Sequence, residues 1–180
     1  MEKLHTMRMH SGFTLIELLV TIAVAGILLS VAVPSYQDFV MNNRMSSKSN
    51  DVLSALQIAR SEAVKRNARV SVCKSAGGAC VTSGSWAQGW MVFVDGGVAG
   101  TMDGTDEAIQ VFPALTGTST LAADANAGDF ISYLPTGMPN LAVGSTAMLT
   151  LCPGVTGIRG RQIEIVAAGR ANITPITACP

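Results

Sequence analysis

The stretch GFTLIELLVTIAVAGILLSVAV, residues 12–33, decides the fold of this chain of 180 residues. From Phe13 to Val33 it is a run of 21 residues whose only charged side chain is Glu17, and it contains neither proline nor a side-chain amide. As an α-helix this run is about 32 Å long, which matches a bilayer hydrocarbon core of about 30 Å. The run therefore predicts a membrane-spanning helix.

Glu17 is the anomaly of this run, because a carboxylate inside a membrane is costly. It costs about 3 kcal/mol at the bilayer centre and less near an end. The thirteen Leu, Ile, Val and Phe residues of the run together contribute about 6 kcal/mol in favour of insertion. Insertion of the run into a membrane is therefore still favourable. The natural partner of Glu17 is a positive group that is buried beside it when subunits assemble.

Two other interpretations of the run compete with a subunit contact. The first is a charge that is tolerated because it lies close to the membrane interface. The second is a secretory signal peptide cut after Ala23-Val24-Ala25. The signal peptide fits less well, since an h-region normally holds no acid and the apolar sequence continues past this tripeptide.

The residues after the run predict an α+β fold. Val52, Leu56, Ala59 and Ala63 recur at helical spacing, so the helix is expected to continue past Pro34, with a kink there, to about Asn67. Alternating segments then predict strands at 69–74, 89–94, 108–112, 130–134, 147–152, 161–168 and 171–174. Segments such as 96–105 and 116–128 are expected to be loops. Strands without intervening helices imply an antiparallel sheet packed on the second half of the helix.

The polar segment ahead of the run indicates the orientation in the membrane. It carries Lys3 and Arg8 against Glu2, so residues 1–12 are expected in the cytoplasm and the chain beyond Val33 in the periplasm. The predicted organisation is a leader at 1–12, a transmembrane helix at 13–33, an amphipathic helix at 34–67 and a periplasmic β domain at 68–180.

All four cysteines, Cys73, Cys80, Cys152 and Cys179, follow the apolar run. In the periplasm such cysteines form disulfides rather than metal sites. Three pairings are available, and Cys73–Cys80 with Cys152–Cys179 is the simplest. Both histidines precede the run, so the spacing does not indicate a zinc site, and we expect no metal and no cofactor.

The residues around Glu17 resemble a known motif. Gly12-Phe13-Thr14-Leu15-Ile16-Glu17-Leu18-Leu19-Val20 is similar to the N-terminal methylation motif of type IV pilins and type II secretion pseudopilins. The resemblance implies a type IV pilin-like fold, cleavage between Gly12 and Phe13 by a prepilin peptidase, and N-methylation of Phe13. It also implies that Glu17 neutralises the N-terminal amine of a neighbouring subunit, and that the helix breaks near Pro34.

A second resemblance, to the GspH/FimT family of minor pilins and minor pseudopilins, extends to about residue 95. Its residues are Asn43-Arg44, Leu53, Ala59–Ala63, Val70–Cys73, Trp86, Gly89-Trp90, Phe93 and Asp95. It implies a subunit that initiates or caps assembly of a type IV pilus or a type II secretion pseudopilus. The implied partners are other minor subunits, the major subunit, the prepilin peptidase and an inner-membrane assembly platform. The implied location is the inner membrane, or the tip of an extracellular filament.

Three C-terminal arginines raise the alternative of a DNA-binding subunit at a pilus tip. Arg159, Arg161 and Arg170 follow a segment, 75–158, that holds no Lys or Arg. Some members of this family resemble DNA-uptake receptors with a Gly-Arg-x-Arg motif, of which Gly169–Asn172 keeps only the first arginine. Three phosphate contacts give a salt slope of only about −2.7. The favoured interpretation is solvated strand and turn residues, with Glu164 as a pairing partner.

An enzyme is not indicated by this sequence. It has no Gly-rich phosphate loop, no G-x-S-x-G and no histidine beyond the leader. Its net charge of zero gives no general attraction to nucleic acid or anionic lipid. The sequence therefore favours an assembly protein over a catalyst.

Overall fold

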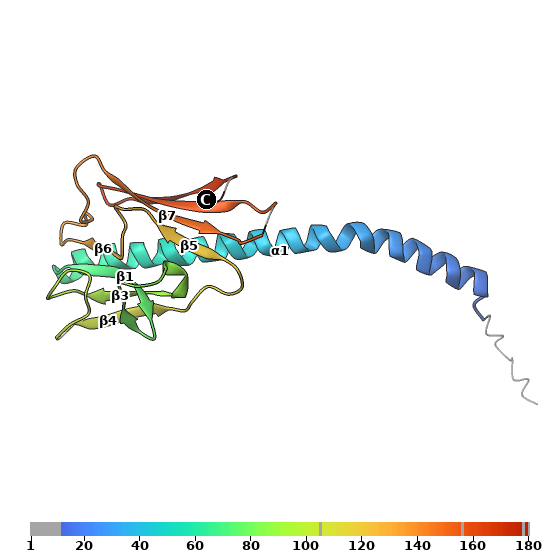
Figure 1. Cartoon of the computed structure of the whole chain (residues 1–180), viewed down its shortest axis with the longest axis horizontal. Helices are drawn as coiled ribbons and strands as arrows, with labels where there is room; N and C mark the ends of the chain where they lie inside the picture. Colours follow the sequence, from blue (N-terminus) through green and yellow to red (C-terminus); the bar gives the residue numbers. More distant parts are fainter. Residues whose placement is uncertain (1–11, 105, 156, 178, 180) are drawn as a thin grey trace, which may run out of the picture. The chain divides into compact units, whose positions relative to one another are not determined.

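The computed structural model describes residues 12–104, 106–155, 157–177 and 179. A long helix, α1 (Leu15–Arg66), is followed by β-strands (Figure 1). The chain divides into two compact units, unit 1 up to Phe39 and unit 2 from Val40 onward, and α1 contributes to both. The expected leader lies outside the described residues apart from Gly12.

Both ends of α1 are set by local chemistry. At the start, Thr14 Oγ1 accepts a hydrogen bond from the Glu17 N–H at 3.2 Å, which is the bond of an N-cap. At the end, Asn67 adopts a positive φ of 50°. The N–H groups of Asn67 and Ala68 donate to the carbonyls of Val64 and Ala63. This is the Schellman pattern, which satisfies carbonyls left open at the helix end.

Pro34 lies inside α1, and the helix runs through it without interruption. Proline has no N–H, so the Ser30 carbonyl one turn earlier lacks its usual donor. The boundary between the two units follows at Phe39. The helix of about 54 residues expected from the sequence is observed with 52, whereas the kink at Pro34 stays a prediction.

The first sheet of unit 2 is built around one central strand. Its members are β1 (Val70–Ala76), β2 (Ala79–Cys80), β3 (Trp90–Val94), β4 (Glu107–Phe112) and β6 (Phe130–Tyr133). The order is β2-β1-β3-β4, with β6 also paired to β1, and every pairing is antiparallel. Gly77 and Gly78 join β1 to β2 with positive φ at both residues, as a two-residue hairpin turn requires.

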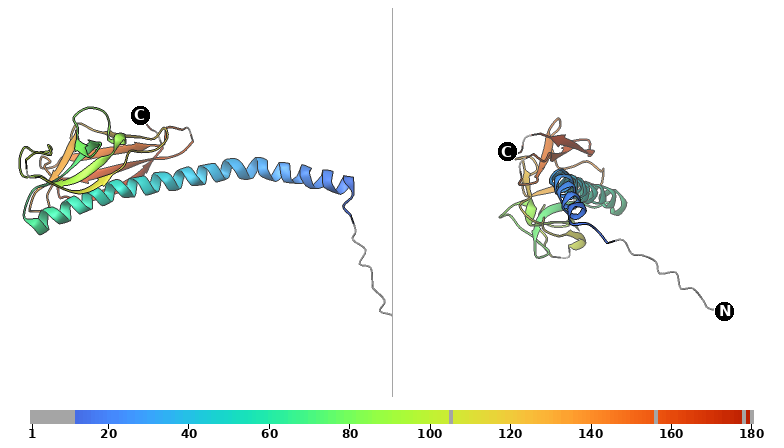
Figure 2. Two further views of the ribbon diagram at one scale, coloured as in Figure 1. Left: turned by 90° about the horizontal axis from the view of Figure 1, so that it is seen from below. Right: turned by 90° about the vertical axis from the view of Figure 1, so that its right-hand side faces the viewer.

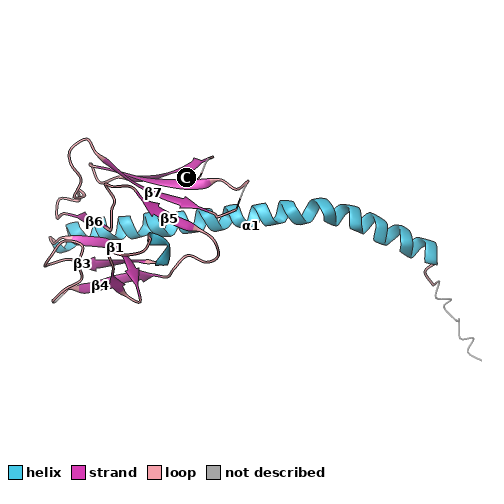
Figure 3. Ribbon diagram, in the orientation of Figure 1, coloured by secondary structure: helices cyan, strands magenta, loops and turns pink. Residues whose placement is uncertain are grey.

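The second sheet follows the order β5-β7-β8-β9, again antiparallel (Figure 3). Its strands are β5 (Thr120–Ala123), β7 (Thr146–Cys152), β8 (Gly160–Val166) and β9 (Ala171–Ile176). β9 forms one edge of this sheet and contains Pro175, which stands opposite Arg161 of β8.

The expected single sheet is corrected to two, and two of their strands were missed. β2 has only two residues, and β5 lies inside a segment that was expected to be a loop. The composition of 116–128 is that of a loop, but Leu121 is fully buried and anchors the segment as a strand. The strand expected at 161–168 ends at Val166, because the next residues form the β8–β9 turn.

The core of unit 2 lies between the second half of α1 and the two sheets. The predicted stripe Val52, Leu56, Ala59 and Ala63 is buried in it, which confirms the amphipathic pattern. Figure 2 shows the strands gathered on one side of this part of the helix. Trp86 and Trp90 are also buried, so the two tryptophans serve the core rather than a ligand surface.

Candidate functional site

The apolar run is exposed along its whole length in the isolated chain. No residue of its most hydrophobic window, of mean hydropathy 2.5, is buried within the described part of the protein. Phe13 is 78% exposed, and Leu15, Ile27 and Val31 are each more than 65% exposed. Monomeric soluble proteins rarely expose an apolar surface of this extent. By length and composition this part of α1 is able to cross a membrane.

Glu17 lies in the first turn of α1. It stands three residues after Thr14, and the sequence Thr14-Leu15-Ile16-Glu17 has the spacing of a capping box. A carboxylate in the first turn also interacts favourably with the helix dipole, by about 0.3–1 kcal/mol at an exposed site. Glu17 therefore has a local structural role as well as the role that its membrane position suggests. The spacing of Thr14 and Glu17 is visible in the sequence, but this capping role was not predicted from it.

Gly12 and Phe13 precede the helix and are exposed. They do not belong to the first turn of α1, because the capping bond begins at Thr14. A protease needs an extended, accessible segment, and the backbone at these two residues has no helical hydrogen bonds to break. The geometry is compatible with cleavage at this bond.

Both predicted disulfides are present. Cys73 is joined to Cys80, and Cys152 to Cys179. The first closes the β1–β2 hairpin, whereas the second ties the end of β7 to the residues that follow β9. The second bond closes the longer loop, with a sequence separation of 27 against 7. Each of them restrains one of the two sheets.

Asp95 is the hub of a buried polar network beside the first sheet. Its side chain is fully buried. One carboxylate oxygen accepts from Arg69 at 2.6 Å, and the other accepts from the Ser71 hydroxyl and from the Gly100 N–H at 2.8 Å. Ser71 also shares a 2.6 Å hydrogen bond with Ser132. The network holds the loop after β3 against β1 and β6, so Asp95 is a structural residue.

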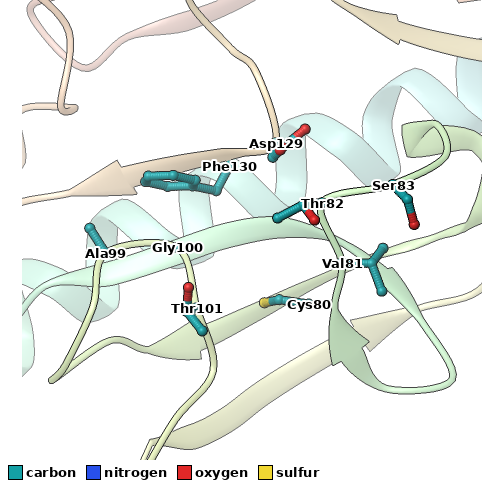
Figure 4. Close-up of a pocket in the computed structure, with 9 residues that line it drawn as sticks. All are labelled: Cys80, Val81, Thr82, Ser83, Ala99, Gly100, Thr101, Asp129 and Phe130. Atoms are coloured by element: carbon teal, nitrogen blue, oxygen red, sulfur yellow. The ribbon is translucent and has the colours of Figure 1, made fainter.

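A cavity of about 390 Å³ opens beside the Cys73–Cys80 bond, between the loops that follow β2 and β3 (Figure 4). Its one carboxylate, Asp129, accepts an ion pair from Lys74 at 2.7 Å. Lys74 also donates to the carbonyls of Thr82 and Gly84 at 2.9 and 3.1 Å. The carboxylate of this cavity is therefore paired with Lys74.

No metal centre is formed by the described residues. No group of three or more His, Cys, Asp or Glu side chains lies close together there. Asp103 and Asp106, which lie in the acidic loop before β4, accept hydrogen bonds from the backbone of that loop. Glu107 instead forms an ion pair with Arg66 at 2.7 Å. These carboxylates stabilise the local structure.

The three C-terminal arginines do not form one patch. Arg161 is the second residue of β8 and donates to Ser46 of α1 at 3.3 Å and to the carbonyls of Arg159 and Gly160. Arg170 lies at the end of the β8–β9 turn, opposite Val166. Val166 is five positions after Arg161, which is about 17 Å along the strand. Arg170 therefore stands apart from the other two.

The expected pairing with Glu164 is corrected. Among the ion pairs of the described residues, none joins Glu164 to Arg159, Arg161 or Arg170. Glu164 faces Asn172 in the β8–β9 register. The strand spacing places Arg161 three residues from Glu164 and hence on the opposite face of β8.

Arg60 is the residue that meets Arg170, and the sequence did not single it out as a functional residue. Both arginines line a cavity of about 210 Å³ together with Tyr133 and Gly169. Arg60 donates to the Ala168 carbonyl at 3.3 Å. Burial raises the pKa of Tyr133 to about 12, and the nearby positive charge of Arg60 opposes part of that rise. The two arginines are 110 positions apart in the chain, so no local pattern brings them together.

Comparison with protein families gives two matches. A family model described as "Type II transport protein GspH" matches residues 48–169, which is more than half of the chain. A second model, described as "Prokaryotic N-terminal methylation motif", matches residues 7–33. Together they cover α1 except for residues 34–47, and most of both sheets.

Curated relatives match over shorter stretches. The fimbrial protein EcpC of Eikenella corrodens is 49% identical over 43 residues, which are 24% of this chain and 28% of that protein. A fimbrial protein of Pseudomonas aeruginosa is 40% identical over 58 residues, 32% of this chain and 37% of that protein. The chain thus matches roughly a third of the length of these relatives.

Two solved structures share the fold. The type IV minor pilin FimU of Pseudomonas aeruginosa aligns with a TM-score of 0.59 at 20% identity, covering 79% of this chain and 96% of that one. The minor pseudopilin EpsH of the type 2 secretion system of Vibrio cholerae aligns with a TM-score of 0.53 at 10% identity, covering 73% and 97%. The expected fold of a long helix packed on antiparallel strands is thereby confirmed.

Proposed function

The chain belongs to the family described as type II transport protein GspH, and from this premise we propose that it is a minor filament subunit that initiates or caps assembly. The filament is either a type IV pilus or a type II secretion pseudopilus. The observation that carries the proposal is Glu17, the one charged residue of the exposed apolar run at the start of α1. An exposed surface of this kind needs a membrane or other helices around it.

The proposed sequence of events begins with insertion of the apolar run into the inner membrane. A prepilin peptidase then cleaves between Gly12 and Phe13, which removes the leader 1–12 and leaves Phe13 as the N-terminus to be methylated. The segment 13–33 serves as the membrane and assembly helix, 34–67 continues into the globular part, and 68–180 is the periplasmic β domain.

The charge of Glu17 supplies specificity in this scheme. Its carboxylate pairs with the N-terminal amine of an adjacent subunit, so the two opposite charges neutralise each other in apolar surroundings. A single buried charge is costly, and it is satisfied when its partner arrives. The axial position of one subunit against the next is thereby fixed by one ion pair, while the apolar side chains around it provide most of the contact area.

The test separates this role from helix capping. Glu17→Ala should leave membrane insertion intact and abolish incorporation into the filament or its tip complex, as measured by membrane fractionation and by recovery with sheared filaments. Thr14→Ala removes the capping hydroxyl and should have a much smaller effect on incorporation. Glu62→Ala, a carboxylate of α1 outside the apolar run, is the matched control. Incorporation of Glu17→Ala at the wild-type level would contradict the proposal.

Equal losses in Glu17→Ala and Thr14→Ala would assign Glu17 to capping alone. The machine is identified by a deletion strain. Lost twitching indicates a type IV pilus, whereas secreted enzymes retained in the periplasm indicate type II secretion. A deletion strain that shows neither defect would contradict a role in assembly.

A further inference from the structure

The cavity that Arg60 and Arg170 share lies wholly within unit 2, between α1 and the β8–β9 turn. Its volume is about 210 Å³, and its polar lining residues are Gln57, Arg60, Tyr133 and Arg170. Two arginines thus line it, with no carboxylate among its lining residues. Glu164 lines a neighbouring cavity with Arg170, but among the ion pairs of the described residues none involves Arg60 or Arg170.

Tyr133 adds an unused hydrogen-bond donor. The residue is 1% exposed and lines the cavity, and none of the side-chain hydrogen bonds of the described residues involves its hydroxyl. A phenol is protonated at neutral pH at its ordinary pKa of about 10, and burial raises the pKa of Tyr133 further, to about 12. The hydroxyl is therefore able to donate to an acceptor in the cavity.

Two glycine turns hold Arg60 in place. A Cβ at Gly169 would meet the Gly137 carbonyl oxygen and would lie 3.1 Å from Arg60 Nε. A Cβ at Gly137 would lie 3.4 Å from the same nitrogen. Both glycines have positive φ, 76° and 81°. The backbone therefore packs closely around the guanidinium, and a side chain held in this way is preorganised for binding.

We propose that this cavity binds a carboxylate, supplied by an Asp or Glu side chain of a partner protein. Arginine pairs with a carboxylate through two parallel N–H donors, and a neutral phenol donates a further bond. Burial of the phenol and the small volume fit one acidic side chain. A nucleic-acid strand would need a longer basic groove with stacking surfaces, and Arg159 and Arg161 lie too far along the sheet to extend this one.

The mouth of the cavity faces outward. Gln57, which lies on α1, and Arg170 are both exposed. A partner subunit that packs along this side of the helix brings its acidic side chains to the cavity. Identification of the partner as a neighbouring filament subunit rests on the function proposed above, whereas the carboxylate chemistry does not.

The experiment uses the full chain in detergent micelles with tyrosine labelled by ¹³C at Cζ. The chain has two tyrosines, so Tyr36 is the internal control. At constant ionic strength, N-acetylglutamate α-amide and acetate should shift the Tyr133 signal saturably and leave Tyr36 unchanged. The uncharged N-acetylglutamine α-amide should have no effect. Inorganic phosphate and a single-stranded oligonucleotide are the competing anions.

Arg170→Gln should weaken carboxylate binding at least about tenfold, since a hydrogen bond to a charged group is lost. This variant changes an exposed turn residue, so it is expected to fold. Arg60→Gln should weaken binding similarly, and Arg161→Gln is the matched control, expected to bind like the wild type. Glu17→Ala should also bind normally, which separates this proposal from that of filament assembly.

Three results would overturn the proposal: no saturable shift of Tyr133, an equal shift with the uncharged amide, or unchanged binding by Arg170→Gln. Tighter binding of the oligonucleotide than of the carboxylate would assign the cavity to nucleic acid instead. If the carboxylate binds but Arg170→Gln is incorporated into filaments at the wild-type level, the identification of the partner as a neighbouring subunit is wrong.

Discussion

The two halves of α1 belong to the same helix but differ in whether their apolar side chains are buried. Up to Phe39 its apolar side chains are exposed throughout, whereas from Met45 onward the apolar stripe is buried in the core of unit 2. The second half buries its apolar side chains against its own chain. The first half obtains its hydrophobic stabilisation only from a membrane or from other subunits. Folding and assembly are therefore assigned to separate parts of one helix.

The most direct way to break this comparison is one substitution made in each half. Leu56→Ala removes a fully buried side chain and should lower the free energy of unfolding of unit 2 by about 4 kcal/mol. Leu28→Ala, in the exposed half, should leave it unchanged. Thermal unfolding of the full chain in micelles, followed by near-ultraviolet circular dichroism, measures both. A comparable loss in Leu28→Ala would show that the halves are not independent.

The disulfides test whether unit 2 depends on its own restraints. Replacing Cys152 and Cys179 together by serine opens a loop of sequence separation 27, and replacing Cys73 and Cys80 together opens one of 7. Loop-closure entropy gives losses of about 3.5 and about 2.4 kcal/mol respectively. Denaturant unfolding measures the two double variants, and the reverse ranking would contradict the entropic explanation. Neither variant should change membrane insertion.

Pro34→Ala tests whether the local stability of the first half of α1 affects the stability of unit 2. It supplies the missing N–H to the Ser30 carbonyl and should stabilise this part of the helix locally by about 3 kcal/mol. Amide hydrogen exchange over residues 30–38 should slow, while the melting temperature of unit 2 stays constant. A raised melting temperature would mean that Pro34 limits the stability of the globular part as well.

The smallest effect is expected at the exposed end of the helix. Hydrogen bonds from Arg66 and then Lys65 lower the pKa of Glu62 below its ordinary value of 4.5. The folded state therefore favours the ionised carboxylate, and its stabilisation is present above pH 4.5 and is lost as the pH falls below that value. In Glu62→Gln the melting temperature should fall slightly less between pH 7 and pH 3 than in the wild type. A larger fall would reverse the sign of this interaction.

The helix and most strands could be predicted from the sequence, because the spacing of apolar residues within each of them shows the period of a helix or of a strand. Leu121 shows the limit: three small or polar neighbours give its strand no alternation, and its burial depends on pairing with β7. The motif around Glu17 could be recognised because its residues are consecutive in the sequence. The cavity of Arg60 and Arg170 was not, since its residues converge only when the β8–β9 turn folds back onto α1.

Pro175 has a consequence for chains that are packed at high density. The Val166 N–H bonds to the Arg170 carbonyl at the β8–β9 turn, and counting alternate pairs from there makes Arg161 and Pro175 a non-hydrogen-bonded pair. The nitrogen at 175 therefore points to the open edge of β9, where it offers no hydrogen to an incoming strand. Such an edge resists unplanned strand addition. Copies of this chain held side by side are thus kept from merging their sheets.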